Sequence, residues 1–151
     1  MVLNSRGVTL IELLLVVALL GIILLTAYPF FDPFISKYTL AKDAKQMAWT
    51  LRSARQKAIT TGEPQYVEFK PHANKYEYNG EEIPLSEGIH YVGSTTFPKK
   101  SNGMIMCSFA SNGVPSSAGT VTLRDKYNNQ LYIIVNPVGG RVRISTEPPK
   151  T

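Results

Sequence analysis

The sequence predicts an α+β protein, with one long N-terminal α-helix packed on a small, mostly antiparallel β-sheet head. Residues 13–31 form an uncharged, mostly apolar run, and residues 35–61 repeat apolar side chains at helical spacing. After Pro64 the chain consists of short alternating segments separated by glycine, asparagine and proline. One helix followed only by strands is typical of an α+β domain.

The apolar run begins with an acid, Glu12, and a short polar segment containing Arg6 precedes it. Its 19 uncharged residues exceed the roughly 18 that a membrane-spanning helix needs. A carboxylate in lipid is costly and usually has a function. The run is too long for the apolar part of a secretory signal peptide, and no Ala-x-Ala site follows it. A plain signal anchor with a chance acid stays as an alternative.

Residues 7–12, Gly-Val-Thr-Leu-Ile-Glu, together with the apolar run resemble the class III signal of type IV pilins and pseudopilins. The resemblance implies that residues 1–7 are a leader that a prepilin peptidase removes between Gly7 and Val8. The same enzyme would N-methylate Val8, although the family most often has phenylalanine there. Residues 8–34 would then form a transmembrane helix that becomes the filament core.

The resemblance also implies that Glu12 meets the N-terminal amine of a neighbouring subunit during assembly. Electrostatics favours the same pairing, because an amine at Val8 and the Glu12 carboxylate are both costly in lipid. Staggered subunits relieve both costs, so we predict that Glu12 sets the register between subunits. Pro29 lies where pilin anchors commonly carry a proline, and the resemblance therefore assigns it to assembly as well.

The implied partners are the prepilin peptidase, other pilins or pseudopilins, an inner-membrane assembly platform and the lipid bilayer. The protein would be a single-pass inner-membrane protein whose head lies on the extracytoplasmic side. Pro29 and Pro33 each lack an amide donor and disfavour helix in the preceding residue. We therefore predict a kink or a loosened stretch over residues 28–34.

Residues 35–62 are predicted to form the amphipathic half of the helix, which ends at Gly62 and Pro64. Apolar residues step by three or four along one stripe: Leu40, Ala44, Met47, Leu51, Ala54 and Ala58. The opposite side carries polar residues and one tryptophan: Lys42, Lys45, Trp49, Arg52 and Gln56. Trp49 can stack a nucleic-acid base or pack against a neighbouring subunit, and helix-to-helix packing in a filament favours the second.

Residues 63–146 are predicted to form the β-rich head and residues 147–151 a disordered tail. Asn79-Gly80 is the strongest hairpin signal. The predicted strands are residues 65–70, 75–78, 81–85, 89–93, 103–110, 120–124, 130–135 and 141–145.

Residues 51–59, Leu-Arg-Ser-Ala-Arg-Gln-Lys-Ala-Ile, resemble an element of the GspH/FimT-like branch of pseudopilins and minor pilins. The pattern from Phe109 to Ile144 resembles the end of the GspH-type domain, whereas residues 72–100 match no recognised pattern. The branch implies a minor pseudopilin, a structural subunit of a type II secretion system pseudopilus. The alternatives are a DNA-binding FimT-like minor pilin of a type IV pilus or competence system, and a major pilin.

Arg141 and Arg143 follow Gly140 in a Gly-Arg-x-Arg element. In FimT-like minor pilins such an element is associated with DNA binding, so the resemblance makes DNA a possible partner. Two arginines at i and i+2 of a strand share a face, and each can contact a phosphate. Four more cations are expected to extend this patch: Lys99, Lys100, Arg124 and Lys126. The alternative is that both arginines are simply solvated.

Charge is segregated along the chain, with basic residues prevailing over residues 37–57 and 99–151 and acids over residues 58–98. Such segregation often marks surfaces that bind a polyanion or a complementary subunit. Cys107, the only cysteine, is predicted to be a buried, inert thiol. Phosphate loops, nucleophile motifs and paired metal ligands are missing, so we predict no enzymatic activity, no cofactor and no metal.

Overall fold

The structure is a computed structural model that describes residues 9–93, 95–100 and 103–149, and for residues 26–30 it describes the backbone alone. Residue contacts divide the chain into two compact units between Ile35 and Ser36. Helix α1, Leu10–Thr61, contributes residues to both units.

In the N-terminal unit every side chain of residues 10–25 is exposed, and most of them are apolar. The backbone is helical throughout residues 28–34. The loosened stretch, one of the two alternatives predicted there, is therefore not observed, and Pro29 and Pro33 do not end the helix. Within the described residues, no helix combines the length and the apolarity that crossing a membrane requires.

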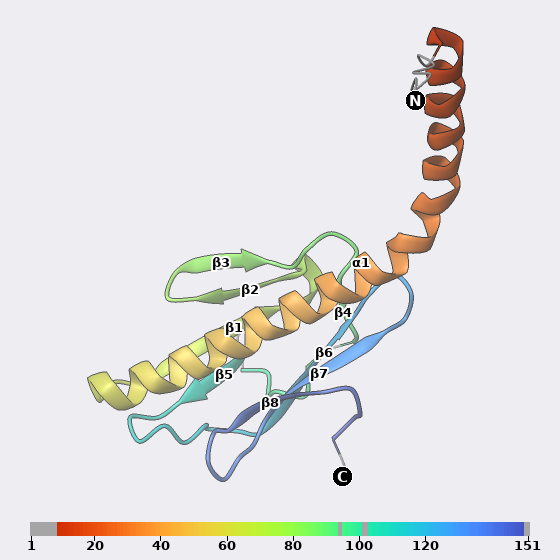
Figure 1. Cartoon of the computed structure of the whole chain (residues 1–151). Coiled ribbons are helices and arrows are strands. Elements are labelled where there is room, and N and C mark those ends of the chain that lie inside the picture. Colours follow the sequence, from red (N-terminus) through yellow and green to blue (C-terminus); the bar gives the residue numbers. More distant parts are fainter. Residues whose placement is uncertain (1–8, 94, 101–102, 150–151) are drawn as a thin grey trace, which may run out of the picture. The chain divides into compact units, whose positions relative to one another are not determined.

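The described part of the head contains the rest of α1 and two antiparallel four-stranded sheets (Figure 1). The first sheet has the order β3-β2-β1-β5, formed by β1 (Gln65–Lys70), β2 (Lys75–Tyr78), β3 (Glu81–Pro84) and β5 (Ile105–Phe109). The second has the order β4-β6-β7-β8, formed by β4 (His90–Tyr91), β6 (Gly119–Arg124), β7 (Gln130–Val135) and β8 (Val142–Ser145). A 3-10 helix, η1 (Pro71–Ala73), joins β1 to β2.

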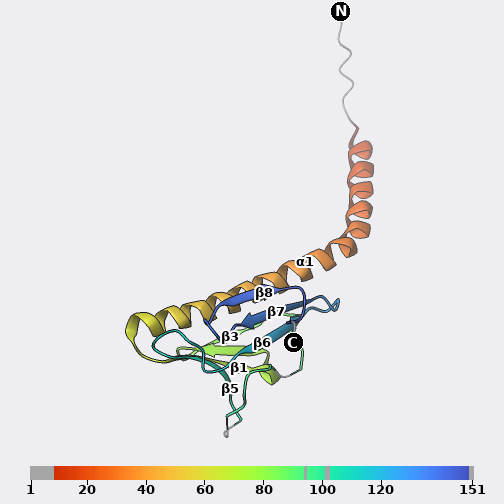
Figure 2. The same cartoon turned by 90° about the horizontal axis from the view of Figure 1, so that it is seen from below.

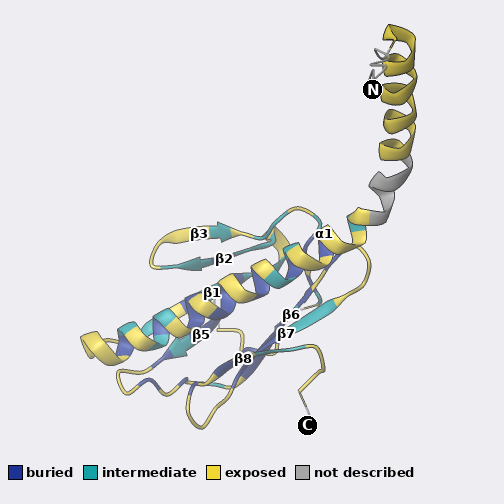
Figure 3. Ribbon diagram, viewed as in Figure 1, coloured by how far each residue is buried: buried dark blue, intermediate teal, exposed yellow. Residues whose placement is uncertain are grey.

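The predicted apolar stripe of α1 is the part of the helix that packs on the sheets. Leu40 is 1% exposed and the other five stripe residues are fully buried. Figure 2 shows this part of α1 lying along one side of the strands, and Figure 3 shows its buried face between exposed positions. The core cluster, which draws on α1 and both sheets, extends from Leu40 to Val142. The head therefore contains its own hydrophobic core.

The predicted hairpin at Asn79-Gly80 is confirmed, since β2 pairs with β3 and both turn residues have positive φ, 57° and 82°. These angles suit the type I′ turn of a two-residue hairpin. The strand predicted over residues 89–93 is shorter, because β4 ends at Tyr91 and Gly93 turns the chain with a φ of 63°. The strand predicted over residues 103–110 is likewise trimmed to β5.

Two buried acids attach strand connections to α1. Asp43 accepts hydrogen bonds from the backbone N–H and the Oγ of Ser86, at 2.7 and 2.8 Å. Asp125, in the β6–β7 turn, accepts one from the Oγ of Ser36 at 3.2 Å. Burial opposes ionisation of Asp125, but bonds from Asn129, the Tyr127 backbone and Ser36 outweigh it, so its pKa is lowered.

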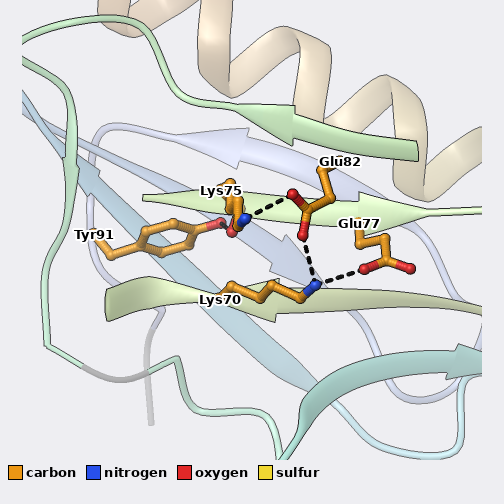
Figure 4. A network of polar contacts seen from close by, with 5 residues as sticks. All are labelled: Lys70, Lys75, Glu77, Glu82 and Tyr91. Carbon is orange, nitrogen blue, oxygen red and sulfur yellow. Dashed lines mark hydrogen bonds and ion pairs between the residues drawn. The ribbon is translucent and has the colours of Figure 1, made fainter. Parts of the chain in front are cut away.

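A network of ion pairs crosses the outer surface of the first sheet (Figure 4). The Nζ of Lys70 contacts Glu77 at 2.6 Å and Glu82 at 2.9 Å, and the Nζ of Lys75 contacts Glu82 at 2.6 Å. The Tyr91 hydroxyl donates to the Lys75 carbonyl at 3.2 Å. Three strands are thus linked through Glu82, but pairs this exposed add little to stability.

Candidate functional site

The N-terminal signal is described only from Thr9 onward, so the predicted cleavage and methylation site at Gly7 and Val8 lies outside the described residues. Glu12 is exposed in the first turn of α1. Its backbone N–H donates to the Oγ1 of Thr9 at 3.3 Å, and the N–H of Leu13 donates to the Thr9 carbonyl at 3.2 Å. Thr9 is therefore the N-cap of α1, and Glu12 occupies the position where an acid suits the helix dipole.

This capping role was missed from the sequence, although Thr-x-x-Glu is a recognised signature of a helix start. Glu12 thus has a role in starting the helix that is independent of any contact between subunits. The backbone of Pro29, the other predicted assembly residue, belongs to α1.

A groove of about 860 Å³ lies between α1 and the segment that contains β8. We call it the basic groove. Its lining from α1 consists of Trp49, Arg52, Ser53, Arg55 and Gln56, and its lining from the other side consists of residues 139–144. The structure thereby brings together two features that were predicted separately, the tryptophan among cations on α1 and the Gly-Arg-x-Arg element. Among the residues that the structure describes, four arginines line the groove and no acidic residue does.

Arg141 and Arg143 are both exposed, whereas Val142 between them is only 6% exposed. Val142 and Arg143 pair with Val135 and Ile134 of β7, which places this segment at the end of the second sheet. The strand predicted over residues 141–145 begins one residue later, so Arg143 belongs to β8 and Arg141 precedes it. Both arginines are nevertheless exposed on either side of the buried Val142.

Two other arginines attach α1 to this region. Arg52 donates from Nη2 to the carbonyl oxygen of Val142 at 3.0 Å. One turn further along α1, Arg55 donates from Nε to the carbonyl oxygen of Gly113 at 3.1 Å. Both bonds satisfy backbone acceptors that no strand pairing satisfies, and they hold the two guanidinium groups in the wall of the groove.

Gly140 is required by the backbone and by the space around it. Its φ is 61°, which side chains other than glycine rarely tolerate. A Cβ at Gly140 would lie 2.6 Å from the carbonyl oxygen of Gly113 and 2.9 Å from the Nε of Arg55. The glycine of the Gly-Arg-x-Arg element therefore has a structural role, because it lets the chain enter β8 directly beneath Arg55.

The expected extension of the cationic patch is wrong, since none of the four additional cations lines the basic groove. Lys99 lines a different groove together with Phe69 and His72. Arg124 precedes Asp125, which contacts Ser36. Ser36 precedes Trp49 by thirteen residues, or about 20 Å along α1, so Arg124 lies far from the basic groove.

The predicted burial of Cys107 is confirmed, because its side chain is inaccessible. Burial raises the pKa of its thiol to about 12, so it stays protonated and unreactive at neutral pH. In the described parts of the chain no three histidine, cysteine or acidic side chains gather into a metal site.

Residues 3–28 match the family described as the prokaryotic N-terminal methylation motif, and residues 43–139 match the type II transport protein GspH. The second match covers more than half of the chain. The protein belongs to the GspH family. The resemblance seen in the sequence is thus confirmed, and the match includes residues 72–100, for which no pattern had been recognised. The GspH match ends at residue 139. Arg141 and Arg143 therefore lie outside the matched residues.

The fold is similar to that of a solved minor pseudopilin and a solved minor pilin, and no curated protein matches the chain. The minor pseudopilin EpsH from the Type 2 Secretion System of Vibrio cholerae has a TM-score of 0.56 and 13% identity, covering 70% of this chain and 95% of EpsH. The type IV minor pilin FimU of Pseudomonas aeruginosa (strain PAO1) has a TM-score of 0.52 and 15% identity, covering 77% and 93%. Family and fold are therefore those of structural pilin-like subunits.

Proposed function

We propose that this GspH-family chain is a minor pseudopilin, a structural subunit of a type II secretion pseudopilus that assembles through its N-terminal helix. The observation that carries the proposal is the order of the two matches, a methylation motif over residues 3–28 followed by a GspH domain over residues 43–139. A methylation motif directly before such a head is the arrangement of a prepilin, so we assign cleavage to the bond between Gly7 and Val8.

The exposed apolar side chains of residues 10–25 support assembly through the helix, because so large an apolar surface is normally buried against a membrane or another protein. In our proposal the lipid bilayer covers it before assembly and neighbouring helices cover it in the filament. The proposed partners are the prepilin peptidase, other pseudopilins and the assembly platform of the inner membrane, with the head on the extracytoplasmic side.

Processing is tested by co-expressing the chain with a prepilin peptidase. We expect the parent chain to lose its leader, and mass spectrometry of the product to identify a methylated Val8. Gly7→Val should leave the precursor uncut, whereas Ser5→Val, which places the same side chain two residues earlier, should be cut normally. Mature-sized product from the Gly7 variant would contradict the assignment.

Assembly is tested with a pair of variants that separates the two roles of the signal. Glu12→Ala should be processed but fail to enter filaments, because the amine of the neighbouring subunit loses its partner. Thr9→Ala removes the helix cap and keeps the carboxylate, so it should still assemble. If both variants fail alike, capping rather than pairing explains Glu12. Restored secretion in a strain lacking its own minor pseudopilin of this type would support the type II system over a type IV pilus.

We propose DNA binding at the basic groove as a second function, which would suit a minor pilin of a type IV pilus or competence system. It is favoured by the position of Arg141 and Arg143 beside Trp49 in a groove without acids. Phosphate binding by arginine is salt-dependent. Arg141→Ala with Arg143→Ala should therefore weaken a salt-dependent DNA shift, whereas Lys99→Ala with Lys100→Ala, outside the groove, should not. Equal binding by both double variants would exclude this site.

A further inference from the structure

We infer that the basic groove takes an unpaired nucleic-acid strand, with one base stacked on the indole of Trp49 and neighbouring phosphates held by Arg141 and Arg143. This inference rests on the proposed second function and specifies its ligand as single-stranded rather than double-stranded. The stacking residue comes from α1 and the phosphate-binding residues from the segment around β8, so the site exists only in the folded head.

Trp49 is 67% exposed, although the stripe of α1 that faces the sheets is buried almost completely. The core therefore does not require the indole, and the indole lies in the wall of the groove, one turn before Arg52. Proteins that bind unpaired strands stack the bases on exposed aromatic rings within positively charged grooves. A duplex keeps the faces of its bases stacked inside, so it can offer the groove only its phosphates.

The arginines lie where a strand stacked on Trp49 would carry its phosphates. Arg141 and Arg143 are both exposed, lie on either side of the buried Val142, and line the same groove as Trp49. On the opposite wall Arg52 and Arg55 are held by their bonds to the carbonyls of Val142 and Gly113. Cations therefore face the groove from both walls, and none of the lining residues is an acid that would repel a phosphate.

The same contacts argue against an extended peptide as the occupant. A peptide commonly binds such a place by adding a strand to an open sheet edge. β8 is the last strand of its sheet. The carbonyl of Val142, one of the acceptors that an added strand would use, already receives a bond from Arg52. This contact blocks strand addition at the residue between the two phosphate-binding arginines.

Trp49 is the only tryptophan in the chain, so fluorescence reports on the proposed stack directly. The full chain, purified in detergent, is titrated at low salt with an oligothymidylate, a duplex of equal length, an abasic strand and heparin. We expect saturable quenching by the oligothymidylate and weaker binding of the duplex and the abasic strand. Trp49→Ala should bind the oligothymidylate about 5- to 150-fold more weakly, and Trp49→Phe should recover part of this loss.

Tyr38→Ala is the matched control, because Tyr38 is an aromatic residue of α1 that is 76% exposed and does not line the groove. It should bind like the parent chain. Arg141→Ala with Arg143→Ala should make the slope of log K against log salt concentration less negative. The expected change is about 0.7 for each lost phosphate contact.

Three results would overturn the inference. The first is that Trp49→Ala binds the oligothymidylate as tightly as the parent chain, or that the duplex binds at least as tightly as the oligothymidylate. In that case the groove binds phosphates alone, and the proposed DNA binding remains without base stacking. If heparin competes fully at equal charge, the groove is a general polyanion-binding surface. If no nucleic acid binds, the second proposed function fails together with the inference.

Discussion

Arg52 of α1 donates a hydrogen bond to the carbonyl oxygen of Val142 at 3.0 Å, across 90 positions of sequence. Val142 separates Arg141 from Arg143, so this contact fixes the helix against the strand that carries both arginines of the candidate site. It also satisfies a backbone acceptor at the open edge of β8. One contact thus serves the stability of the head and the geometry of the groove.

Arg52→Ala should lower the free energy of unfolding of the head by about 1 kcal/mol, because the Val142 carbonyl loses a charged donor. Chemical denaturation of residues 36–151 measures this change. Lys45→Ala, at an exposed position of the same helix that does not line the groove, is the control and should be nearly neutral. Equal stability of the two variants would show that water replaces the arginine without cost.

Gly140→Ala should destabilise the head by at least about 2 kcal/mol. The backbone conformation alone costs an alanine about 1–2 kcal/mol, and the added Cβ would press on the Gly113 carbonyl oxygen and on Arg55. Gly139→Ala provides a matched control one residue earlier, because a Cβ there would contact nothing within 4 Å. Thermal unfolding should separate the two variants clearly, and a tolerated Gly140→Ala would contradict the close packing of this turn.

Glu82 should titrate far below an ordinary glutamate. Hydrogen bonds from Lys75 and from Lys70 lower the pKa of its carboxyl from 4.5 to about 2. A carboxyl with a lowered folded pKa stabilises the fold above its unfolded value, and this contribution is lost as the pH falls from 4.5 through 2. Glu82→Gln should therefore flatten the pH dependence of stability in this window.

NMR titration of the Glu82 side chain measures its pKa directly. Lys75→Met should move the midpoint upward, because it removes the strongest hydrogen bond to the carboxylate. Lys42→Met is the control, since Lys42 contacts Ser86 instead of Glu82. A midpoint near 4.5 in the parent head would mean that the network is absent in solution.

Cys107 should resist alkylation in the native head at neutral pH. Burial keeps the thiol inaccessible and raises its pKa to about 12, so almost no reactive thiolate forms. Labelling followed by mass spectrometry should be slow in buffer and fast in denaturant. Ser111→Cys in a Cys107→Ala background is exposed and should react without denaturant. Rapid labelling of native Cys107 would indicate that β5 opens readily.

Local patterns were sufficient to predict the elements. The spacing of apolar residues identified the buried stripe of α1, because a helix presents one face to its core. Asn79-Gly80 identified the hairpin, because few residues adopt both of its positive φ angles. Thr9 and Glu12 carry an equally local signal for the start of α1, because Thr-x-x-Glu is typical of a helix N-terminus.

The division into two sheets was not predictable in this way. Gln65 of β1 pairs with Phe109 of β5, and three other strands lie between them in sequence. Pairing over such a separation depends on how the whole core closes, because loop-closure entropy and burial decide it together. A periodic pattern predicts which face of a strand is buried, but it does not predict which other strand pairs with it.

The sequence by itself therefore determined the family, the long helix and the residue types of the candidate site. Only the tertiary structure decided that Trp49 and Arg52 share a groove with Arg141 and Arg143, while the four other cations considered lie elsewhere. The physical reason is that α1 must bury its apolar stripe on the sheets, which brings its polar side to the edge of β8. Arg52, Arg55 and the close contact at Gly140 then hold that edge in place.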